Sequence, residues 1–325
     1  MNKKLIFRVL LVCIFLILVL VFVYSGLRIL ESTVLFHEQE QEQIVSKTIV
    51  EDGIAYYPRQ DLSVVLLMGI NQTGKVKPTE YNRGGAVDML TLMVFDKKTK
   101  TCNLLSLNRD MMVSMPALNM EGRAVGTYYG QLAYSHTYGD GMKDSCENVR
   151  KTVSKLLNGI PIDYYFALNL DAIALFNDAV GGVTVTVEDD FSAVTPELPM
   201  GQQVHLTGEQ AVTFVQTRWD VGDELNLSRM ERHKAYIHGF VEKMKDCMES
   251  DAGFVIDTYE TVSDYIVTDC TPAILSRLVT DYGEYTLGKS LAVEGENVLG
   301  EEYYEFYADE EKLKDLVLAL FYAPK

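Results

Sequence analysis

Leu62-Ser-Val-Val-Leu-Leu-Met-Gly69 opens the stretch of sequence that decides the fold. Two further short runs rich in Val, Leu and Met follow it, at residues 89–96 and 101–107. Short apolar runs of this kind, bounded by polar residues, predict strands. The polar sequence Lys97-Lys-Thr-Lys100 separates the last two runs and favours a hairpin between them.

Beyond these strands, the hydrophobic period alternates between that of a helix and that of a strand. Apolar residues recur at helical spacing over residues 142–157, and a strand pattern follows at 164–169. A helix pattern at 171–179 and a strand pattern at 183–187 repeat this order. The alternation predicts an α/β fold. Residues 111–131 show no clear period, and we expect a loop there.

Further helices are indicated by their start signals. Thr207-Gly-Glu-Gln210 and Ser228-Arg-Met-Glu231 both fit the capping box, in which the first and fourth side chains each accept a backbone N–H from the other residue. We therefore expect one helix from Thr207 and another from Ser228 to about Met248. Thr271-Pro272 predicts the start of a third helix. An amphipathic pattern at 309–322 predicts a last one.

The N-terminal segment carries a membrane signal. Residues 5–27 are apolar apart from Arg8 and a few small or weakly polar side chains. At about 1.5 Å of rise per residue, such a helix crosses a bilayer core of about 30 Å. The basic residues upstream predict a cytoplasmic N-terminus at 1–4 by the positive-inside rule. We expect a single-pass protein of the cell membrane, with a transmembrane helix at 5–27, a helical stalk or linker at 28–60 and an extracellular domain at 61–325.

The charge of the chain limits its ligands. The formal net charge is −17, and the basic residues at the N-terminus lie on the other side of the predicted span. A strongly acidic exported domain argues against binding of nucleic acid or any other extended polyanion. An anionic ligand would instead have to be met locally, by a few arginines that converge in a cleft.

The cysteines beyond the predicted span allow disulfides. Four are present, so two bridges are possible in an exported domain. We favour Cys102–Cys146 and Cys247–Cys270 because each pair is close in sequence. Buried free thiols are the alternative, and the spacing does not match a C-x-x-C metal site.

Two arginines occupy the first turn of the helix that we expect to begin at Ser228. Arg229 and Arg232 share a helix face, with His233 one turn on from Arg229. A helix N-terminus is partially positive and favours acids, so arginines there leave an excess of positive charge that a phosphate would satisfy. The alternative is a surface network in which acidic neighbours neutralise them. Arg218, just upstream, could point the same way.

A second group of candidates lies at the ends of the predicted hairpin. Asp88 begins one strand and Arg109-Asp110 follows the next, so the three side chains could gather at neighbouring strand ends. Carboxylates beside arginines suit a Mg²⁺-bound pyrophosphate, because oxygen ligands hold the cation and guanidinium groups hold the phosphates. A structural Asp–Arg salt bridge is the plain alternative. The sequence shows no Walker loop and no Ser-His-Asp or G-x-S-x-G nucleophile pattern.

Six landmarks, met in order along the chain, resemble the motifs of the LytR-CpsA-Psr family of bacterial cell-envelope enzymes. They are Leu66-Leu-Met-Gly-Ile70 with Val87-Asp-Met-Leu-Thr-Leu-Met-Val-Phe-Asp96, Leu104-Leu-Ser-Leu-Asn-Arg-Asp110, Ile160-Pro-Ile-Asp-Tyr-Tyr165, Asn177-Asp-Ala-Val-Gly-Gly-Val183, Leu206-Thr-Gly-Glu-Gln-Ala211, and Arg229 with Arg232. The resemblance covers nearly everything from the predicted membrane helix to the C-terminus.

This resemblance implies a three-layer α/β/α domain with a central mixed sheet, preceded by one transmembrane helix. It implies a phosphotransferase that binds a polyprenyl-pyrophosphate-linked glycopolymer with Mg²⁺. The enzyme would transfer the phosphopolymer to a peptidoglycan hydroxyl and release polyprenyl phosphate. The expected partners are therefore the lipid-linked glycopolymer, peptidoglycan and the membrane, with no nucleic acid.

The resemblance also implies roles for individual residues at the metal and the reacting groups. Asp88 corresponds to the aspartate on the Mg²⁺ side of the family's R-S-D motif, and Arg109 with Asp110 corresponds to its P-R-D element. Asn71 stands where the family has a metal-side aspartate. Arg109 would offset charge on the phosphates, and Asp110 is the candidate base for the acceptor hydroxyl.

Three further arginines are implied to grip the pyrophosphate together with Arg109. Arg218 matches the second arginine of the family's R-T-R motif. Arg229 and Arg232 match the arginines before and within its R-Q element.

Four positions depart from the family pattern. Asn71 replaces an aspartate, Ala86 and Gln216 replace arginines, and His233 replaces a glutamine. A lost charge-assisted bond to a phosphate costs about 1.5–3 kcal/mol, although Asn71 can still offer a carbonyl oxygen to Mg²⁺. Two readings follow: a divergent transferase, or a noncatalytic binder of lipid-linked glycan or scaffold in cell-envelope assembly. A transcriptional regulator is disfavoured, because at most about eight residues precede the predicted span.

Overall fold

The structure, a computed structural model, describes residues 48–223, 225–251 and 253–324. The predicted cytoplasmic N-terminus at 1–4, the predicted transmembrane helix at 5–27 and most of the predicted stalk lie outside these residues. Within the described ranges, no helix combines the length and the apolar character needed to cross a membrane. Lys47–Lys325 forms one compact unit.

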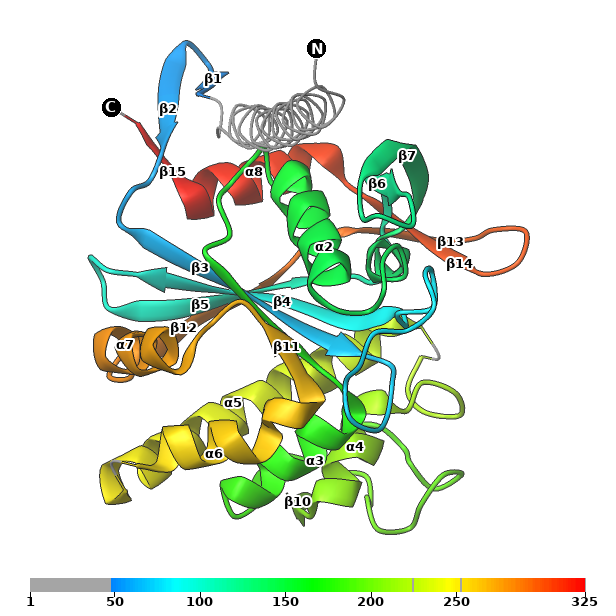
Figure 1. The fold of residues 1–325 in the computed structure, drawn as a ribbon, viewed down its shortest axis with the longest axis vertical. Coiled ribbons are helices and arrows are strands. Elements are labelled where there is room, and N and C mark those ends of the chain that lie inside the picture. Colours follow the sequence, from blue (N-terminus) through cyan, green and yellow to red (C-terminus); the bar gives the residue numbers. More distant parts are fainter. Residues whose placement is uncertain (1–47, 224, 252, 325) are drawn as a thin grey trace, which may run out of the picture. The chain divides into compact units, whose positions relative to one another are not determined.

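A six-stranded mixed sheet forms the centre of this unit (Figure 1). Its strands, in order, are β11 (Ile266–Thr268), β8 (Tyr164–Leu168), β3 (Leu62–Ile70), β4 (Val87–Asp96), β5 (Thr101–Leu107) and β12 (Thr286–Ala292). Strand β3 runs parallel to β8 and antiparallel to β4, and β5 runs antiparallel to β4 and parallel to β12. The predicted α/β class, the central mixed sheet and the β4–β5 hairpin are confirmed.

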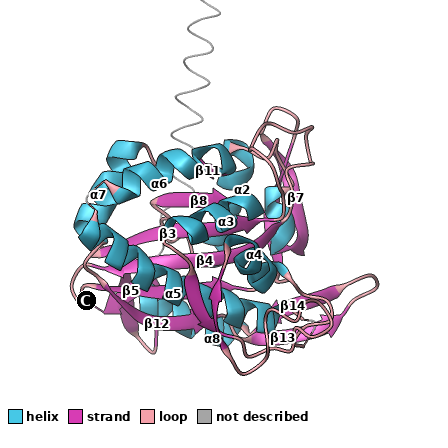
Figure 2. Cartoon of the chain, turned by 90° about the horizontal axis from the view of Figure 1, so that it is seen from below, coloured by secondary structure: helices cyan, strands magenta, loops and turns pink. Residues whose placement is uncertain are grey.

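Helices cover both faces of the sheet (Figures 1 and 2). On one face, α2 (Lys143–Leu156) and α8 (Glu310–Phe321) share a core with Leu66 and Met68 of β3. The other face is covered by α3 (Leu170–Ala179), α4 (Gly208–Gln216), α5 (Asn226–Ser250) and α6 (Phe254–Val262). Helix α7 (Pro272–Tyr282) reaches the same face as α5, where Tyr282 stacks on Phe95 of β4. Because both faces are covered, the strands read as almost continuous apolar runs.

The predicted helix starts are confirmed at Thr207 and Thr271 but not at Ser228. Thr207 and Gln210 form the complete capping box of α4, and Thr271 caps α7. Helix α5 begins at Asn226 instead, with no side-chain cap. Asp223 accepts hydrogen bonds from the Leu225 N–H and from the Ser228 hydroxyl, so the hydroxyl of Ser228 donates rather than capping.

Two segments expected to lack strands form them. Residues 112–131 make a hairpin of β6 (Met112–Leu118) and β7 (Ala124–Gln131) instead of a loop. Most of β7 is exposed, so it lacks the apolar alternation that marks a half-buried strand. At the N-terminal end of the described chain, β1 (Ile49–Glu51) and β2 (Ile54–Pro58) replace the expected stalk.

The remaining strands form small accessory sheets. Strand β2 pairs with the last strand, β15 (Tyr322–Pro324). The others are β9 (Val183–Thr186) with β10 (Gln203–Leu206), and β13 (Gly295–Leu299) with β14 (Tyr304–Ala308). Two short 3₁₀ helices, η1 (Leu132–His136) and η2 (Ser263–Tyr265), complete the described elements.

The favoured disulfides are wrong: all four described cysteines are free thiols. Cys102 packs with Ile237 of α5, whereas Cys146 belongs to α2 and lies in the core on the opposite face. The sheet therefore separates two cysteines that are close in sequence. Burial raises the pKa of Cys102 to about 12, so its thiol stays protonated near neutral pH.

Candidate functional site

The β4–β5 hairpin brings the first site residues together. Leu90 of β4 pairs with Leu107 of β5, so Asp88 lies beside Arg109, just beyond the end of β5. The Arg109 guanidinium forms an ion pair with Asp88, and its Nε lies 3.3 Å from Oδ1 of Asp110. Asp88, Arg109 and Asp110 thus gather at the open end of the β4–β5 hairpin, as their positions in the sequence predict.

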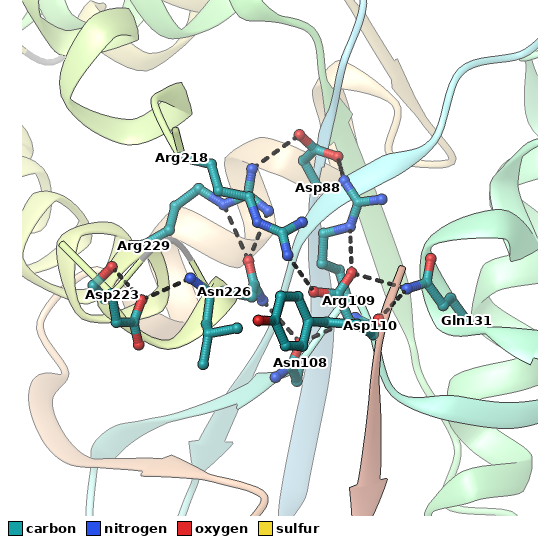
Figure 3. A network of polar contacts seen from close by, with 12 residues as sticks. Asp88, Asn108, Arg109, Asp110, Gln131, Arg218, Asp223, Asn226 and Arg229 are labelled. Carbon is teal, nitrogen blue, oxygen red and sulfur yellow. Dashed lines mark hydrogen bonds and ion pairs between the residues drawn. The ribbon is translucent and has the colours of Figure 1, made fainter. Parts of the chain in front are cut away.

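The first turn of α5 brings Arg229 to the same carboxylate (Figure 3). Its Nη1 lies 3.2 Å from Oδ2 of Asp88, so two guanidinium groups flank that side chain. The Nε and Nη2 of Arg229 donate to Oδ1 of Asn226 at 3.0 and 2.7 Å. The Asn226 amide in turn donates to Oδ1 of Asn108 at 3.0 Å, which ties the start of α5 to the end of β5.

The loop after α4 supplies the third arginine. Nη2 of Arg218 lies 3.3 Å from Oδ2 of Asp110, and Gln131 donates to Oδ1 of the same carboxylate at 3.3 Å. Arginines from three separate stretches therefore surround two carboxylates (Figure 3). Among the described residues of this cluster, the guanidinium groups outnumber the carboxylates, in a chain whose net charge is −17. Such a site suits an anion.

Burial strengthens the electrostatics of this cluster. Only 3% of the Asp110 side chain and 3% of the Arg229 side chain are exposed. Burial lowers the pKa of Arg229, and the neighbouring Asp88 opposes this shift. Interactions among charges at such depth are screened much less by water and salt than those on the surface.

The structure does not bring Arg232 into this cluster. Its Nη1 and Nη2 donate to the carbonyl oxygens of Phe214 and Thr217 at 2.7 and 2.6 Å, and its Nε lies 3.0 Å from Asp189. Burial lowers the pKa of Arg232 to about 10. These contacts of Arg232 hold α4 and the segment after β9 against α5. Arg229 and Arg232 were expected to share a helix face, but they contact different partners.

An apolar cavity of about 270 Å³ opens beside Asp88 and Arg229. It lies between the sheet and helices α3 and α5. Its walls are mainly aliphatic and aromatic side chains, among them Leu67, Met93, Phe166, Phe176, Tyr236 and Val241. The charged and polar lining residues include Asn71, Asp88, Gln216, Arg229 and His233, and we call the part of the cavity that they line its mouth. An apolar cavity of about 150 Å³ already takes a benzene ring, so this one can hold a branched hydrocarbon segment.

His233 is buried in the cavity wall as a neutral side chain. Its Nε2 lies 2.9 Å from the carbonyl oxygen of Val215 and must carry the proton, because a carbonyl only accepts. Burial, followed by the charge of Arg229, lowers the pKa of His233 to about 3. The folded protein therefore resists protonation of this ring.

We expect His233 to make the fold less stable as the pH falls. The unfolded chain binds the proton below about pH 6.5 and the folded chain only near pH 3, so stability is present above pH 6.5 and is lost as pH falls through this window. The loss between pH 6.5 and 4.5 is about 2–3 kcal/mol. His233→Gln removes it, whereas His205→Gln, at an exposed histidine, leaves it unchanged. Urea unfolding at both pH values measures this, and parallel curves for His233→Gln and the parent would contradict it.

The residues at which the chain departs from the family pattern lie near the mouth. Asn71 is exposed, and its N–H donates to the carbonyl oxygen of Ala86 at 3.1 Å, so these two positions are neighbours. Gln216, at the end of α4, lines the cavity with Asn71. Both metal candidates, Asn71 and Asp88, therefore line the same cavity.

The oxygen groups at the mouth fit a metal shared with a ligand better than a metal held by protein alone. In the described part of the chain, no group of three His, Cys, Asp or Glu residues is arranged to hold an ion. Mg²⁺, however, is commonly held by one or two protein oxygens together with substrate phosphates and water. The Asp88 carboxylate and the Asn71 carbonyl are an adequate donor set of that kind.

Sequence reasoning missed three polar residues that organise the site. Asn108, Asn226 and Gln131 hold Arg229 and Asp110 in place. Asn108 lies inside a landmark motif next to Arg109, and this proximity was a usable signal. Asn226 and Gln131 have no such signal, because their partners come from distant parts of the chain.

The fold and the site together define a class: a mixed α/β domain with an arginine–carboxylate cluster at the mouth of an apolar cavity. The chain belongs to the LytR_cpsA_psr family, whose sequence model matches residues 23–320. This confirms the family that the landmarks indicate.

Several named relatives are teichoic acid transferases. The chain is 28% identical over 218 residues to the polyisoprenyl-teichoic acid–peptidoglycan teichoic acid transferase TagU of Enterococcus faecalis, covering 67% of this chain and 65% of that protein. It is 29% identical over 195 residues to TagT of Bacillus subtilis, covering 58% of this chain and 54% of that protein. The match thus spans about half to two thirds of the length of these relatives.

Solved structures share the fold. A structure described as TagT bound to LI-WTA aligns with a TM-score of 0.61 and 24% identity, covering 80% of this chain and 90% of that one. At this identity the likeness establishes the architecture of the domain.

Proposed function

We propose that this protein transfers a polyprenyl-pyrophosphate-linked anionic glycopolymer to a peptidoglycan hydroxyl. The observation that carries the proposal is the convergence of Arg109, Arg218 and Arg229 on Asp88 and Asp110 at the mouth of an apolar cavity. An anionic head joined to a hydrocarbon tail is the ligand that such an arrangement fits. The family relationship to named teichoic acid transferases supports the same reaction class.

The cavity and the arginine–carboxylate cluster would each bind one part of the ligand. The apolar walls take the polyprenyl chain, whose burial contributes about 0.8 kcal/mol per CH₂ group. The arginines bind the two phosphates at the mouth, where their charge offsets the charge that develops during phosphoryl transfer. Asp88 and Asn71 would hold Mg²⁺ there, and the cation would add further charge neutralisation at the pyrophosphate.

Asp110 is the residue that we assign to the acceptor hydroxyl. Its Oδ2 is buried and accepts no aligned hydrogen bond, although the Arg218 guanidinium lies 3.3 Å away. That oxygen can accept the proton of an incoming sugar hydroxyl, while Gln131 fixes the other carboxylate oxygen. The hydroxyl oxygen then attacks the phosphorus next to the polymer, and polyprenyl phosphate leaves.

The sequence supports an extracellular location for this chemistry. The predicted span at 5–27 would hold the domain at the membrane, with the N-terminus in the cytoplasm. A polyprenyl substrate resides in that membrane, and peptidoglycan lies outside it. The proposed localisation therefore places the domain within reach of both partners.

Replacing Arg218 with alanine tests the proposed function. We expect polymer transfer to fall about 10- to 150-fold, because a charge-assisted contact worth about 1.5–3 kcal/mol is lost. The measurement is release of polyprenyl phosphate by the full chain in detergent with a lipid-pyrophosphate donor, Mg²⁺ and peptidoglycan. Arg123→Ala, at a surface arginine that is 68% exposed, is the matched control. Unchanged transfer by Arg218→Ala would sink the assignment.

A second candidate function is noncatalytic binding of lipid-linked glycan. It is favoured by Asn71, Ala86 and Gln216, which each remove a charged group found in the family pattern. A pure binder would retain donor affinity that depends on Arg218 and Arg229 but would release no polyprenyl phosphate. The assay above separates the two functions, because turnover by the parent protein excludes the binder.

A further inference from the structure

Two hairpins bring a group of tyrosines together beside the site. Strand β14 lies next to β6, where Met111 forms a bridge with Phe306. Figures 1 and 2 both place the β6–β7 and β13–β14 hairpins at the same end of the domain. These tyrosines come from β7, from η1, from the turn after η1 and from the turn just before β14. We call Tyr128, Tyr134, Tyr138 and Tyr303 the tyrosine cluster.

Direct ring contacts define this cluster. The rings of Tyr128 and Tyr138 lie 5.9 Å apart between centroids, and those of Tyr134 and Tyr303 lie 6.4 Å apart in an edge-on arrangement. The pKa of Tyr303 is raised by burial first and then by the hydroxyls of Tyr128 and Tyr134, so the two ring pairs are close neighbours. Tyr128 is 39% exposed and Tyr303 is 37% exposed, which leaves aromatic surface open to a ligand.

The backbone is shaped to hold one of these rings. A Cβ at Gly130 would come within 2.4 Å of the Tyr128 ring, so the ring lies directly over this glycine. Any larger residue would displace it. Tyr128 can take this position only because residue 130 is a glycine, which has no side chain.

The tyrosine cluster is continuous with the catalytic candidate Asp110. Gln131 directly precedes η1, and its amide donates both to Asp110 at 3.3 Å and to the carbonyl oxygen of Tyr304 at 2.8 Å. The N–H of Phe306 donates to the Asp110 carbonyl oxygen at 2.9 Å. Both hairpins are therefore fastened to the residue that we assign to the acceptor hydroxyl.

The charges around the cluster decide which substrate it fits. Glu305 and Glu302 act on the Tyr303 hydroxyl, and neighbouring Glu301 adds a further carboxylate. These acids repel an anionic polymer and an anionic membrane surface. Exposed aromatic faces with hydroxyl rims and nearby carboxylates suit uncharged sugar rings, whose C–H faces stack on aromatics and whose hydroxyls donate to acids.

We propose that the tyrosine cluster docks the acceptor glycan strand of peptidoglycan and presents a sugar hydroxyl to Asp110. This inference rests on the proposed function, since it names where the second substrate binds. The arginines hold the anionic donor, and the tyrosines hold the uncharged sugar backbone of the acceptor. Two surfaces of opposite electrostatic character thus meet at one carboxylate.

Cosedimentation of the full chain, in detergent, with insoluble peptidoglycan stripped of attached polymers tests this inference. Two aromatic contacts of about 0.5–1.5 kcal/mol each predict that Tyr128→Ala with Tyr303→Ala weakens binding about 5- to 150-fold. Tyr303→Phe, which keeps the ring face, is expected to bind within a few fold of the parent. Tyr57→Ala, at a tyrosine of β2 that is 41% exposed, is the matched control. In transfer assays the double variant raises KM for peptidoglycan and leaves donor affinity unchanged.

The outcomes separate this inference from the proposed function. Binding of the double variant that equals that of Tyr57→Ala overturns the docking surface, even if transfer itself is observed. Loss of binding to phosphatidylglycerol vesicles, with peptidoglycan binding intact, also overturns it and identifies a membrane contact. Tyrosine-dependent glycan binding by a parent protein that never releases polyprenyl phosphate supports the docking surface and refutes the transferase.

Discussion

Replacing Arg229 with alanine is expected to remove most of the transfer activity while leaving most of the fold intact, because Asp88 keeps its ion pair with Arg109. Arg229 forms an ion pair with Asp88, and its Nε and Nη2 both donate to Oδ1 of Asn226. Its loss therefore removes a buried, preorganised positive charge from the phosphate site. Two charge-assisted phosphate contacts of about 1.5–3 kcal/mol each predict a loss of about a hundredfold or more. The measurement is release of polyprenyl phosphate, with thermal unfolding followed in parallel.

Arg232→Ala is the informative comparison for Arg229→Ala. Arg232 is equally buried, but it holds Asp189 and two backbone carbonyl groups outside the cluster. Breaking a buried ion pair of this kind costs about 3–5 kcal/mol of stability. We therefore expect a lowered melting temperature for Arg232→Ala, with normal donor affinity in the molecules that remain folded. A stable Arg232→Ala protein that loses donor binding would contradict this expectation and indicate that Arg232 binds the phosphates.

Val241→Trp is expected to close the cavity to long hydrocarbon chains. Val241 lines the cavity from α5, and an indole ring at this position occupies part of its volume of about 270 Å³. Exclusion of three or four CH₂ groups removes about 3 kcal/mol of hydrophobic binding, which is about a hundredfold in affinity. The loss should apply to a long polyprenyl donor and be small for a donor whose lipid has only one prenyl unit.

The chain-length comparison also guards against a simple folding defect. A misfolded variant would lose activity toward both donors, whereas a filled cavity discriminates between them. Val50→Trp, at a valine of β1 that is 66% exposed, adds the same ring away from the cavity and serves as the control. Equal losses for the long and the short donor would contradict the assignment of the cavity to the lipid.

The central part of the fold could be predicted because its signals are local. Strands β3, β4 and β5 are nearly continuous apolar runs, and a polar turn joins the last two. Once that hairpin is predicted, the proximity of Asp88 to Arg109 follows from strand pairing alone. The hairpin of β6 and β7 was missed because most of β7 is exposed and shows no alternation.

The parts of the site that could not be predicted depend on distant partners. Helical spacing places Arg229 and Arg232 on one face, but it does not reveal that Asp189 reaches Arg232 from a segment about 40 residues upstream. The same holds for Asn226, whose partner Asn108 is 118 positions away. The cysteine pairing failed for a similar reason, since closeness in sequence ignores the sheet that lies between Cys102 and Cys146.

The pairing of β2 with β15 has a consequence for how the domain folds. Tyr322 lies opposite Pro58, so the second and the last strand of the described chain are hydrogen-bonded neighbours. Contacts of such long sequence separation form late, because a very large loop must close before they are gained. In a nascent chain, β2 therefore lacks its β15 partner until Tyr322–Pro324 has been synthesised. Premature termination even shortly before residue 322 would yield a protein without its closing strand.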